Sequence, residues 1–282
     1  MIDKGVLCLA QNNSTVDYVR LAYLQRMSLA LVNPELPYAL VTDQHSWDLT
    51  SKHMQQAFDH VVIIDNDDAE DQEWKQRNSW QLLRFTPFRE TIKVEADLLF
   101  TRNIDHWWRA LRLRDVVIST GCRNYLGDVS SVRAYRRTFD QNDLPDVYTG
   151  LMYWKRSKTA VELFEQARRI YQDWESVRTN LIACTDPGSN DMVFAIAAKL
   201  LGPELVTCPE LAFFQITHMK PAINFYPPRD QWMKELTIET VPPYIRVRAH
   251  DQQYPFHYHD KSWASDLIME KYEHAFRTRK SH

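Results

Sequence analysis

The stretch Thr91-Ile92-Lys93-Val94-Glu95-Ala96-Asp97-Leu98-Leu99-Phe100 places two acids between two apolar runs. The first run is typical of a buried strand, in which side chains alternate between faces, so Glu95 and Asp97 are expected on the same side. Two such carboxylates can share one divalent cation, and oxygen ligands suit Mg²⁺ or Mn²⁺. The alternative is that the acids only end the strand. The apolar flanks favour the metal hypothesis, because a buried carboxylate needs a partner.

Similar apolar runs recur through the first half of the chain, and stretches with helical spacing separate them. Strands are expected at 5–10, 38–41, 60–64, 91–94 and 115–119, and helices at 16–32 and 74–88. Continuous apolar strands alternating with helices indicate an α/β fold, with a mostly parallel sheet covered by helices on both faces. Ligands of such sheets bind at the carboxyl ends of the strands.

The second half has a different pattern. We expect a strand at 151–154, helices at 160–177 and 191–201, and a C-terminal segment, rich in proline and aromatic residues from 203 to 263, that wraps over the active edge of the sheet. No composition break marks a second domain, so residues 1–282 are predicted to form one. Within it we distinguish a nucleotide-binding half (1–115), an acceptor and closing half (116–263) and a C-terminal helix (264–282).

Composition excludes several classes of protein. The chain has 282 residues, 44% of them hydrophobic and 25% charged, as in ordinary globular proteins. Its six glycines form neither a P-loop nor a G-x-G-x-x-G motif, and its four cysteines form no C-x-x-C pair. We expect no membrane segment, because no apolar run approaches the roughly 20 residues that one needs. The N-terminus does not resemble a signal peptide, so a cytoplasmic location is expected.

The segment from Lys93 to Asp105 resembles the K-x-x-x-x-D-A-D-x-L-x-x-x-N-I-D motif of GT-A glycosyltransferases of the glycogenin type, with Glu95 in the first acidic position. Further similarities follow in the order of that family. Residues 147–154 resemble its F-N-x-G-V-M strand, Asn190-Asp191 stands where it has an Asp-Gln pair, and residues 256–263 resemble a shortened H-x-x-G-x-x-K-P-W motif. The resemblance covers roughly residues 5 to 263. It implies the Rossmann-like GT-A fold and metal-dependent transfer of a sugar from a nucleoside diphosphate sugar, with a UDP-sugar favoured.

The resemblance also implies roles for individual residues. Glu95 and Asp97 would hold Mn²⁺ or Mg²⁺ together with His257 or His259, and His218 is a rival for the histidine position. Lys261 or Lys220 would bind the diphosphate, and Gly150 lies in the strand that faces the donor sugar. The other predicted donor-binding residues are Ala10, Gln11, Asn12 and Asp43 at the ends of the first two strands, and Arg84 on the helix before the acidic strand. For Gln11, Asn12 and Asp43 the alternative is turn formation, and for Arg84 it is an ordinary exposed arginine on a helix.

Asp191 is the candidate residue at the reactive centre, with Asn190 beside it. Asp191 would orient the acceptor hydroxyl or stabilise the developing sugar cation. The alternative is an acid that caps the first turn of a helix, and the two roles are compatible.

The predicted acceptor depends on a basic stretch. Residues 102–137 hold eight arginines and three acids, in a chain whose net charge is −3. An arginine-rich face beside the active edge would suit a phosphate-bearing acceptor, and Arg123, Arg133 and Arg136 are the candidate contacts. The alternative is a solvated surface with internal salt bridges. The chain also resembles transferase-like proteins of tailed phages, which favours a 5-hydroxymethylated pyrimidine in double-stranded DNA as acceptor. A glycan, lipid or small-molecule acceptor, and a non-catalytic GT-A-like binding protein, are the alternatives.

Overall fold

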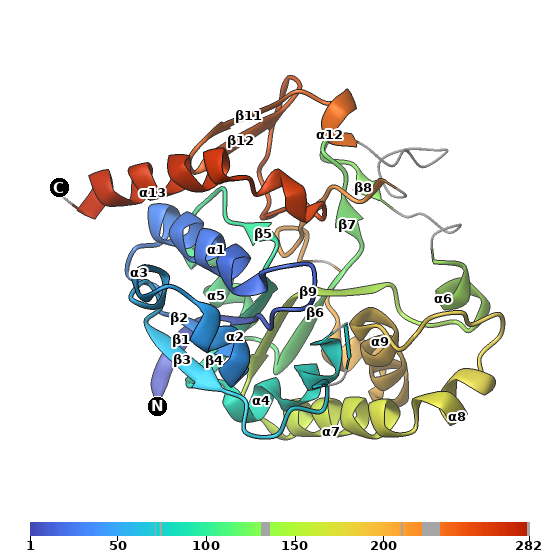
Figure 1. Ribbon diagram of the computed structural model, residues 1–282. Helices are drawn as coiled ribbons and strands as arrows, with labels where there is room; N and C mark the ends of the chain where they lie inside the picture. Colours follow the sequence, from blue (N-terminus) through green and yellow to red (C-terminus); the bar gives the residue numbers. More distant parts are fainter. Residues whose placement is uncertain (71, 74, 131–135, 210, 222–231, 281–282) are drawn as a thin grey trace.

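The computed structural model describes the chain except residues 71, 74, 131–135, 210, 222–231 and 281–282 (Figure 1). Its centre is a six-stranded sheet in the order β3-β2-β1-β4-β9-β6. These strands are β1 (Ile2–Leu9), β2 (Tyr38–Thr42), β3 (His60–Ile63), β4 (Phe88–Glu95), β6 (Val116–Thr120) and β9 (Val147–Lys155). Strand β9 runs antiparallel to both neighbours, whereas β3, β2, β1 and β4 pair in parallel. The expected, mostly parallel α/β sheet is confirmed.

Helices cover both faces of the sheet, and each face has its own apolar cluster. One cluster joins the sheet to α1 (Tyr18–Val32), α5 (Asp105–Leu111) and α13 (Asp266–Lys280), and α13 lies beside α1 in Figure 1. The other joins it to α4 (Leu82–Phe85), α7 (Lys158–Gln172) and α9 (Asn190–Leu201). Strand alternation explains the two clusters, since Val6 and Cys8 of β1 belong to the first and Leu7 to the second.

Shorter helices complete the connections. They are α2 (Gln44–Leu49), α3 (Lys52–Gln55), η1 (Lys75–Gln81), α6 (Arg137–Gln141), α8 (Trp174–Thr179), α10 (Pro203–Val206), α12 (Trp232–Glu235) and η2 (Lys261–Trp263). No helix in the described part of the chain has the length and apolar character needed to cross a bilayer.

The C-terminal segment returns over the carboxyl edge of the central sheet, as expected. It contributes to a second sheet in the order β5-β14-β10-β7-β8. Its strands are β5 (Leu98–Leu99), β7 (Cys122–Arg123), β8 (Val129–Ser130), β10 (Thr217–His218) and β14 (Phe256–His257). The register sets His257 opposite Leu98, directly after the acidic pair. A third, antiparallel sheet contains β11 (Ile238–Val241), β12 (Tyr244–Val247) and β13 (His250–Asp251).

Two helix predictions are wrong in part. The segment expected as one helix over 74–88 is a 3-10 helix, η1, followed by the single turn of α4, and β4 already begins at Phe88. Phe88 pairs with Ile2 at the start of the parallel ladder, so strand pairing determines its conformation. The helix expected over 160–177 is interrupted at Asp173, which separates α7 from α8. Trp74 lies outside the described residues.

Candidate functional site

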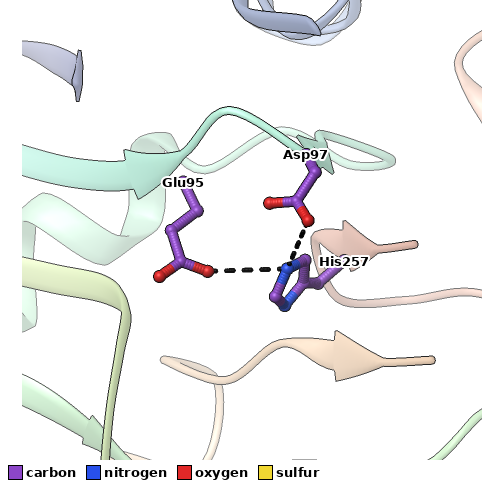
Figure 2. A group of neighbouring side chains, drawn as sticks. All are labelled: Glu95, Asp97 and His257. Carbon is purple, nitrogen blue, oxygen red and sulfur yellow. Dashed lines mark ion pairs between the residues drawn. The ribbon is translucent and has the colours of Figure 1, made fainter. Parts of the chain in front are cut away.

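The acidic pair and one histidine meet where β4 turns into β5. The Nε2 atom of His257 lies 3.0 Å from a carboxylate oxygen of Asp97 and 3.5 Å from one of Glu95. Figure 2 shows both carboxylates directed at the same ring nitrogen. Glu95 ends β4 and Asp97 sits in the following turn, whereas His257 comes from β14, 160 positions later in the sequence. The pairing of β14 with β5 therefore completes the cluster.

Buried charge around Asp97 is compensated by cations. Asp97 is only 5% exposed, and the Nζ of Lys261 donates to it over 2.8 Å. Burial alone would raise the pKa of the Asp97 carboxyl, but His257 and Lys261 hold that pKa well below its usual range. Burial likewise opposes the charged form of His257, yet Asp97 and Glu95 raise its pKa above the ordinary value. The cluster therefore holds an ionised carboxylate whose partners are side-chain cations.

The two other candidate histidines lie beside His257. The ring of His218 stacks on that of His257 at 4.4 Å and 28°, and its Nδ1 accepts a hydrogen bond from the backbone N–H of Lys220. Burial, together with His257, His259 and Lys220, lowers the pKa of His218 well below its usual range. Burial and the cations His257 and Lys261 lower the pKa of His259 to about 4. The ring of His259 lies 6.2 Å from that of His257, so both candidate rings adjoin His257.

The donor set fits a divalent cation. Among the described residues, Glu95, Asp97 and His257 form a group whose ligand atoms all lie within 4.8 Å of one another. Carboxylate oxygens with one imidazole nitrogen suit Mn²⁺, and the oxygens alone suit Mg²⁺. An ion bound by these atoms would take the place of the His257 proton and of Lys261 as the positive partner of Asp97. The Glu95, Asp97 and His257 side chains are called the metal cluster below.

Asp191 lies in a second cluster with Thr149 and Arg136. One carboxylate oxygen of Asp191 accepts hydrogen bonds from the backbone N–H and the hydroxyl of Thr149, each 2.8 Å long. The other oxygen accepts from the guanidinium of Arg136 over 2.9 Å. Both oxygens are thus oriented, while 29% of the side chain stays exposed. Asp191 is also in the first turn of α9, although Ser189 supplies the N-cap.

Asn190 faces away from solvent. Its side-chain oxygen accepts from the Tyr171 hydroxyl, and its backbone N–H donates to Gln76. These contacts anchor the start of α9 and thereby place Asp191. Asn190 therefore has a supporting position in this structure.

The predicted donor residues after β1 and β2 contact one another. The Gln11 amide donates to Asp43 over 3.1 Å, and Asp43 also caps α2 by accepting from Ser46. The backbone N–H of Ala10 continues the ladder to Val41, and the Asn12 side chain accepts from the N–H of Val19. Asn12 and Asp43 therefore bind backbone N–H groups at the starts of α1 and α2, and their role in donor binding stays a prediction.

A groove of 610 Å³ opens next to these residues. Its walls come from the loop after β1, from α2 and from the segment around Glu73, and include Asn12, Asn13, Asp17, His45 and Glu73. Tyr18 follows Asp17, a residue of the groove wall, at the start of α1. Burial raises the pKa of Tyr18, Lys261 opposes that shift, and Asp97, Glu95 and Glu73 add to it.

Of the predicted diphosphate ligands, Lys261 and Lys220 both lie at the site. Lys261 contacts Asp97, as described above. Burial lowers the pKa of Lys220, whereas the charges of Asp191 and Glu95 oppose that shift. Lys220 therefore lies within electrostatic reach of both clusters. Arg84, by contrast, pairs with Asp65 after β3, and β2 and β1 separate that strand from β4.

The arginine-rich stretch is not one face, and this interpretation is wrong. Arg112 and Arg114 precede β6 at the amino edge of the sheet, where Arg112 pairs with Glu90 and Asp3. Arg136 is 5% exposed and pairs with Asp146 and Asp191, so it is unsuited to contacting a macromolecular acceptor. The topology explains why the arginines are separated. Arg112 and Arg114 lie in the connection from α5 to β6, which is at the edge of the sheet opposite the site.

The other two candidate acceptor contacts are Arg123 and Arg133. Arg123 is half-buried, donates to the Gly127 carbonyl and lies over the Tyr254 ring. Arg133 lies outside the described residues.

Two buried polar side chains beside the candidate site, Gln25 and Lys93, do not figure among the residues proposed from the sequence. The amide of Gln25, fully buried in α1, donates to the carbonyl oxygens of Glu95 and Leu98, the residues on either side of the Asp97 turn. Tyr38 donates to the Gln25 oxygen over 2.8 Å. Lys93 is 3% exposed and lies 4.0 Å from Glu95. A polar residue within an otherwise apolar strand or helix was the available signal for both.

The fold is shared with known glycosyltransferase structures. No protein-family model and no curated protein matches the sequence. The glycosyltransferase GlyE of Streptococcus pneumoniae TIGR4 matches with a TM-score of 0.58 at 13% identity, over 100% of this chain and 64% of that one. Mouse xyloside xylosyltransferase 1 matches at a TM-score of 0.47 and 13% identity, over 73% of this chain and 84% of that one. The likeness to GlyE confirms the GT-A fold, and the chain spans less than two thirds of GlyE's length.

Proposed function

We propose that the protein is a metal-dependent glycosyltransferase that moves a sugar from a nucleoside diphosphate sugar to a hydroxyl acceptor. The observation that carries the proposal is the metal cluster, in which the ionised side chain of Asp97, 5% exposed, contacts the cations His257 and Lys261. It lies at the carboxyl edge of a mostly parallel sheet, where this class of fold binds ligands. The GT-A fold supports the reaction class by analogy.

The proposed chemistry requires neutralisation of a leaving group. A divalent ion held by Glu95, Asp97 and His257 would supply positive charge for the nucleoside diphosphate that departs. Lys261 and Lys220 would add positive charge at the same place. Lys261 would do so by moving its contact from Asp97 to a phosphate oxygen. The groove around Asn12 and Glu73 would take the nucleoside, with a UDP-sugar as the favoured donor.

Asp191 is assigned to the reacting sugar or acceptor. Because both of its oxygens are held by Thr149 and Arg136, it keeps a fixed orientation. That suits stabilisation of a developing sugar cation or orientation of the acceptor hydroxyl. It does not suit a group that must swing toward the substrate.

The acceptor proposed from the sequence is a 5-hydroxymethylated pyrimidine in DNA. Its support among the described residues is now limited to Arg123, since Arg136 is engaged internally. A glycan, lipid or small-molecule hydroxyl is the alternative acceptor.

The test is a panel of nucleoside diphosphate sugars, each with and without Mn²⁺, with release of the nucleoside diphosphate as readout. Duplex DNA with and without hydroxymethylated pyrimidines, and simple glycans, are offered as acceptors. Mn²⁺-dependent release with one donor is expected. Absence of release with every donor, from protein that is folded and binds Mn²⁺, would contradict the transferase proposal and favour a non-catalytic binding protein.

A further inference from the structure

Strand β9 is irregular where it passes the metal cluster. Its register against β6 places Met152 opposite Ile118 and then moves directly to Tyr148 opposite Ser119. Its register against β4 ends with Leu151 opposite Val94. Residues 149–151 therefore form a bulge, a feature that often occurs next to active sites.

A bulge removes backbone groups from the ladder, and the freed groups need other partners. The carbonyl oxygen of Thr149 accepts a hydrogen bond from the Nζ of Lys93 over 2.6 Å. The N–H of Thr149 donates to Asp191 over 2.8 Å. Two charged side chains thus hold the bulge, one from the sheet and one from helix α9.

Lys93 also borders the metal cluster. Lys93 and Glu95 are two residues apart on β4 and share a face, with their charged atoms 4.0 Å apart. Gly150, in the bulge, approaches Glu95 so closely that an added Cβ would lie 3.1 Å from its carboxylate oxygen. The position of the bulge therefore limits where the Glu95 carboxylate can lie.

From this geometry we infer that Lys93 is a positioning residue, which fixes the Thr149–Gly150 bulge and, through it, joins the metal cluster to Asp191. A lysine that is 3% exposed is costly unless it has partners, and its partners here are the Thr149 carbonyl and Glu95. The consequence for sugar transfer rests on the proposed function, whereas the mechanical role of Lys93 does not.

The test is amide hydrogen exchange on the full chain without ligands, in the wild type, Lys93→Met and Lys155→Met. Lys155 is the matched control, because it lies at the far end of β9, opposite Glu90 in the regular ladder, and pairs with Asp115. We expect exchange at Thr149 and Gly150 to accelerate at least about tenfold in Lys93→Met and to stay unchanged in Lys155→Met. Unchanged exchange at both residues in a folded Lys93→Met protein would overturn the inference.

A second variant tests the same role if Lys93→Met does not fold. The charge-balanced double substitution Lys93→Met with Glu95→Gln removes the lysine without leaving Glu95 unpaired. It is expected to fold and still to show fast exchange at Thr149, since the carbonyl of that residue lacks its donor; protection equal to the wild type would refute the positioning role.

Mn²⁺ affinity, followed by titration of the same proteins, provides a second readout. Loss of one positive charge 4.0 Å from Glu95 should tighten Mn²⁺ binding in Lys93→Met. We expect a gain of about tenfold in Lys93→Met and none in Lys155→Met, whose charge lies at the far end of β9. If the wild type bound no Mn²⁺, the proposed function would fail, while the exchange experiment would still decide the role of Lys93.

Discussion

The two carboxylates at the centre of this protein, Asp97 and Asp191, are held in opposite ways. Asp97 is buried, and its side chain contacts the cations His257 and Lys261. A bound metal ion can replace the proton of His257, and a phosphate can take over Lys261. Asp191 is partly exposed, yet a backbone N–H, a hydroxyl and a buried guanidinium fix it. The contrast indicates that the first carboxylate is built to exchange partners and the second to remain in place.

The largest expected effect comes from Asp97, the carboxylate whose partners can exchange. Asp97→Asn keeps the shape of the side chain but removes the charge that would hold the metal. Donor turnover should fall by about 10³-fold, the range seen when one electrostatic contact to a transition state is lost. Steady-state kinetics with Mn²⁺ measure it. Asp143→Asn is the control, because Asp143 is an exposed acid that pairs with Lys199; equal losses in both variants would contradict the assignment.

The next largest effect is expected on the free energy of unfolding, from the loss of the guanidinium that holds Asp191. Arg136→Met leaves Asp146 and Asp191 without their buried guanidinium partner. Because both acids keep some solvent contact, we expect a loss of about 2–3 kcal/mol, below the range for fully buried pairs. Urea denaturation measures the loss. An unchanged midpoint would show that Asp191 is not held by Arg136 in solution.

Gln25→Leu tests the hydrogen bonds that hold the turn containing Asp97. It leaves the Glu95 and Leu98 carbonyl oxygens without their side-chain donor in a buried place. We expect a loss of about 2 kcal/mol in stability and weaker Mn²⁺ binding. Tyr38→Phe, which removes only the hydroxyl that anchors Gln25, should shift both quantities in the same direction by less. A loss of stability with no change in Mn²⁺ affinity would separate Gln25 from the metal cluster.

The smallest expected effect is at the contact between the bulge and the metal cluster. Gly150→Ala would place a methyl group 3.1 Å from a Glu95 oxygen, so the carboxylate must shift while the backbone stays unstrained. We expect little change in stability and about tenfold weaker Mn²⁺ binding, equivalent to about 1.4 kcal/mol. Calorimetric titration with Mn²⁺ checks it. Wild-type affinity would mean that Glu95 does not bind the ion from its present position.

Much of the fold follows from local sequence patterns. The apolar runs around Cys8, Leu40 and Val94 predict buried parallel strands, and the structure contains them. The helix expected over 74–88 was wrong because short apolar spacing does not distinguish a 3-10 turn and the start of a strand from a continuous helix. There, the pairing of Phe88 with Ile2 decides the outcome, and no local pattern contains it.

The candidate site was predictable only in part, for the same reason. The spacing of Glu95 and Asp97 indicates a shared face, and the family resemblance proposes His257 or His259, with His218 as a rival. The supporting contacts of Lys93 and Gln25 depend on the β9 bulge and on the packing of α1, which bring distant residues together. The arginine-rich stretch failed as a predictor because neighbours in sequence, such as Arg112 and Arg123, lie on different edges of the fold.

The most direct test of the central claim is a crystal structure of the protein with Mn²⁺ and a nucleoside diphosphate, with anomalous data at the manganese edge. The account predicts one strong anomalous peak between Glu95, Asp97 and His257, with Lys261 on a phosphate oxygen and Asp191 still bound to Thr149 and Arg136. Manganese bound elsewhere, or a diphosphate bound away from these residues, would contradict it.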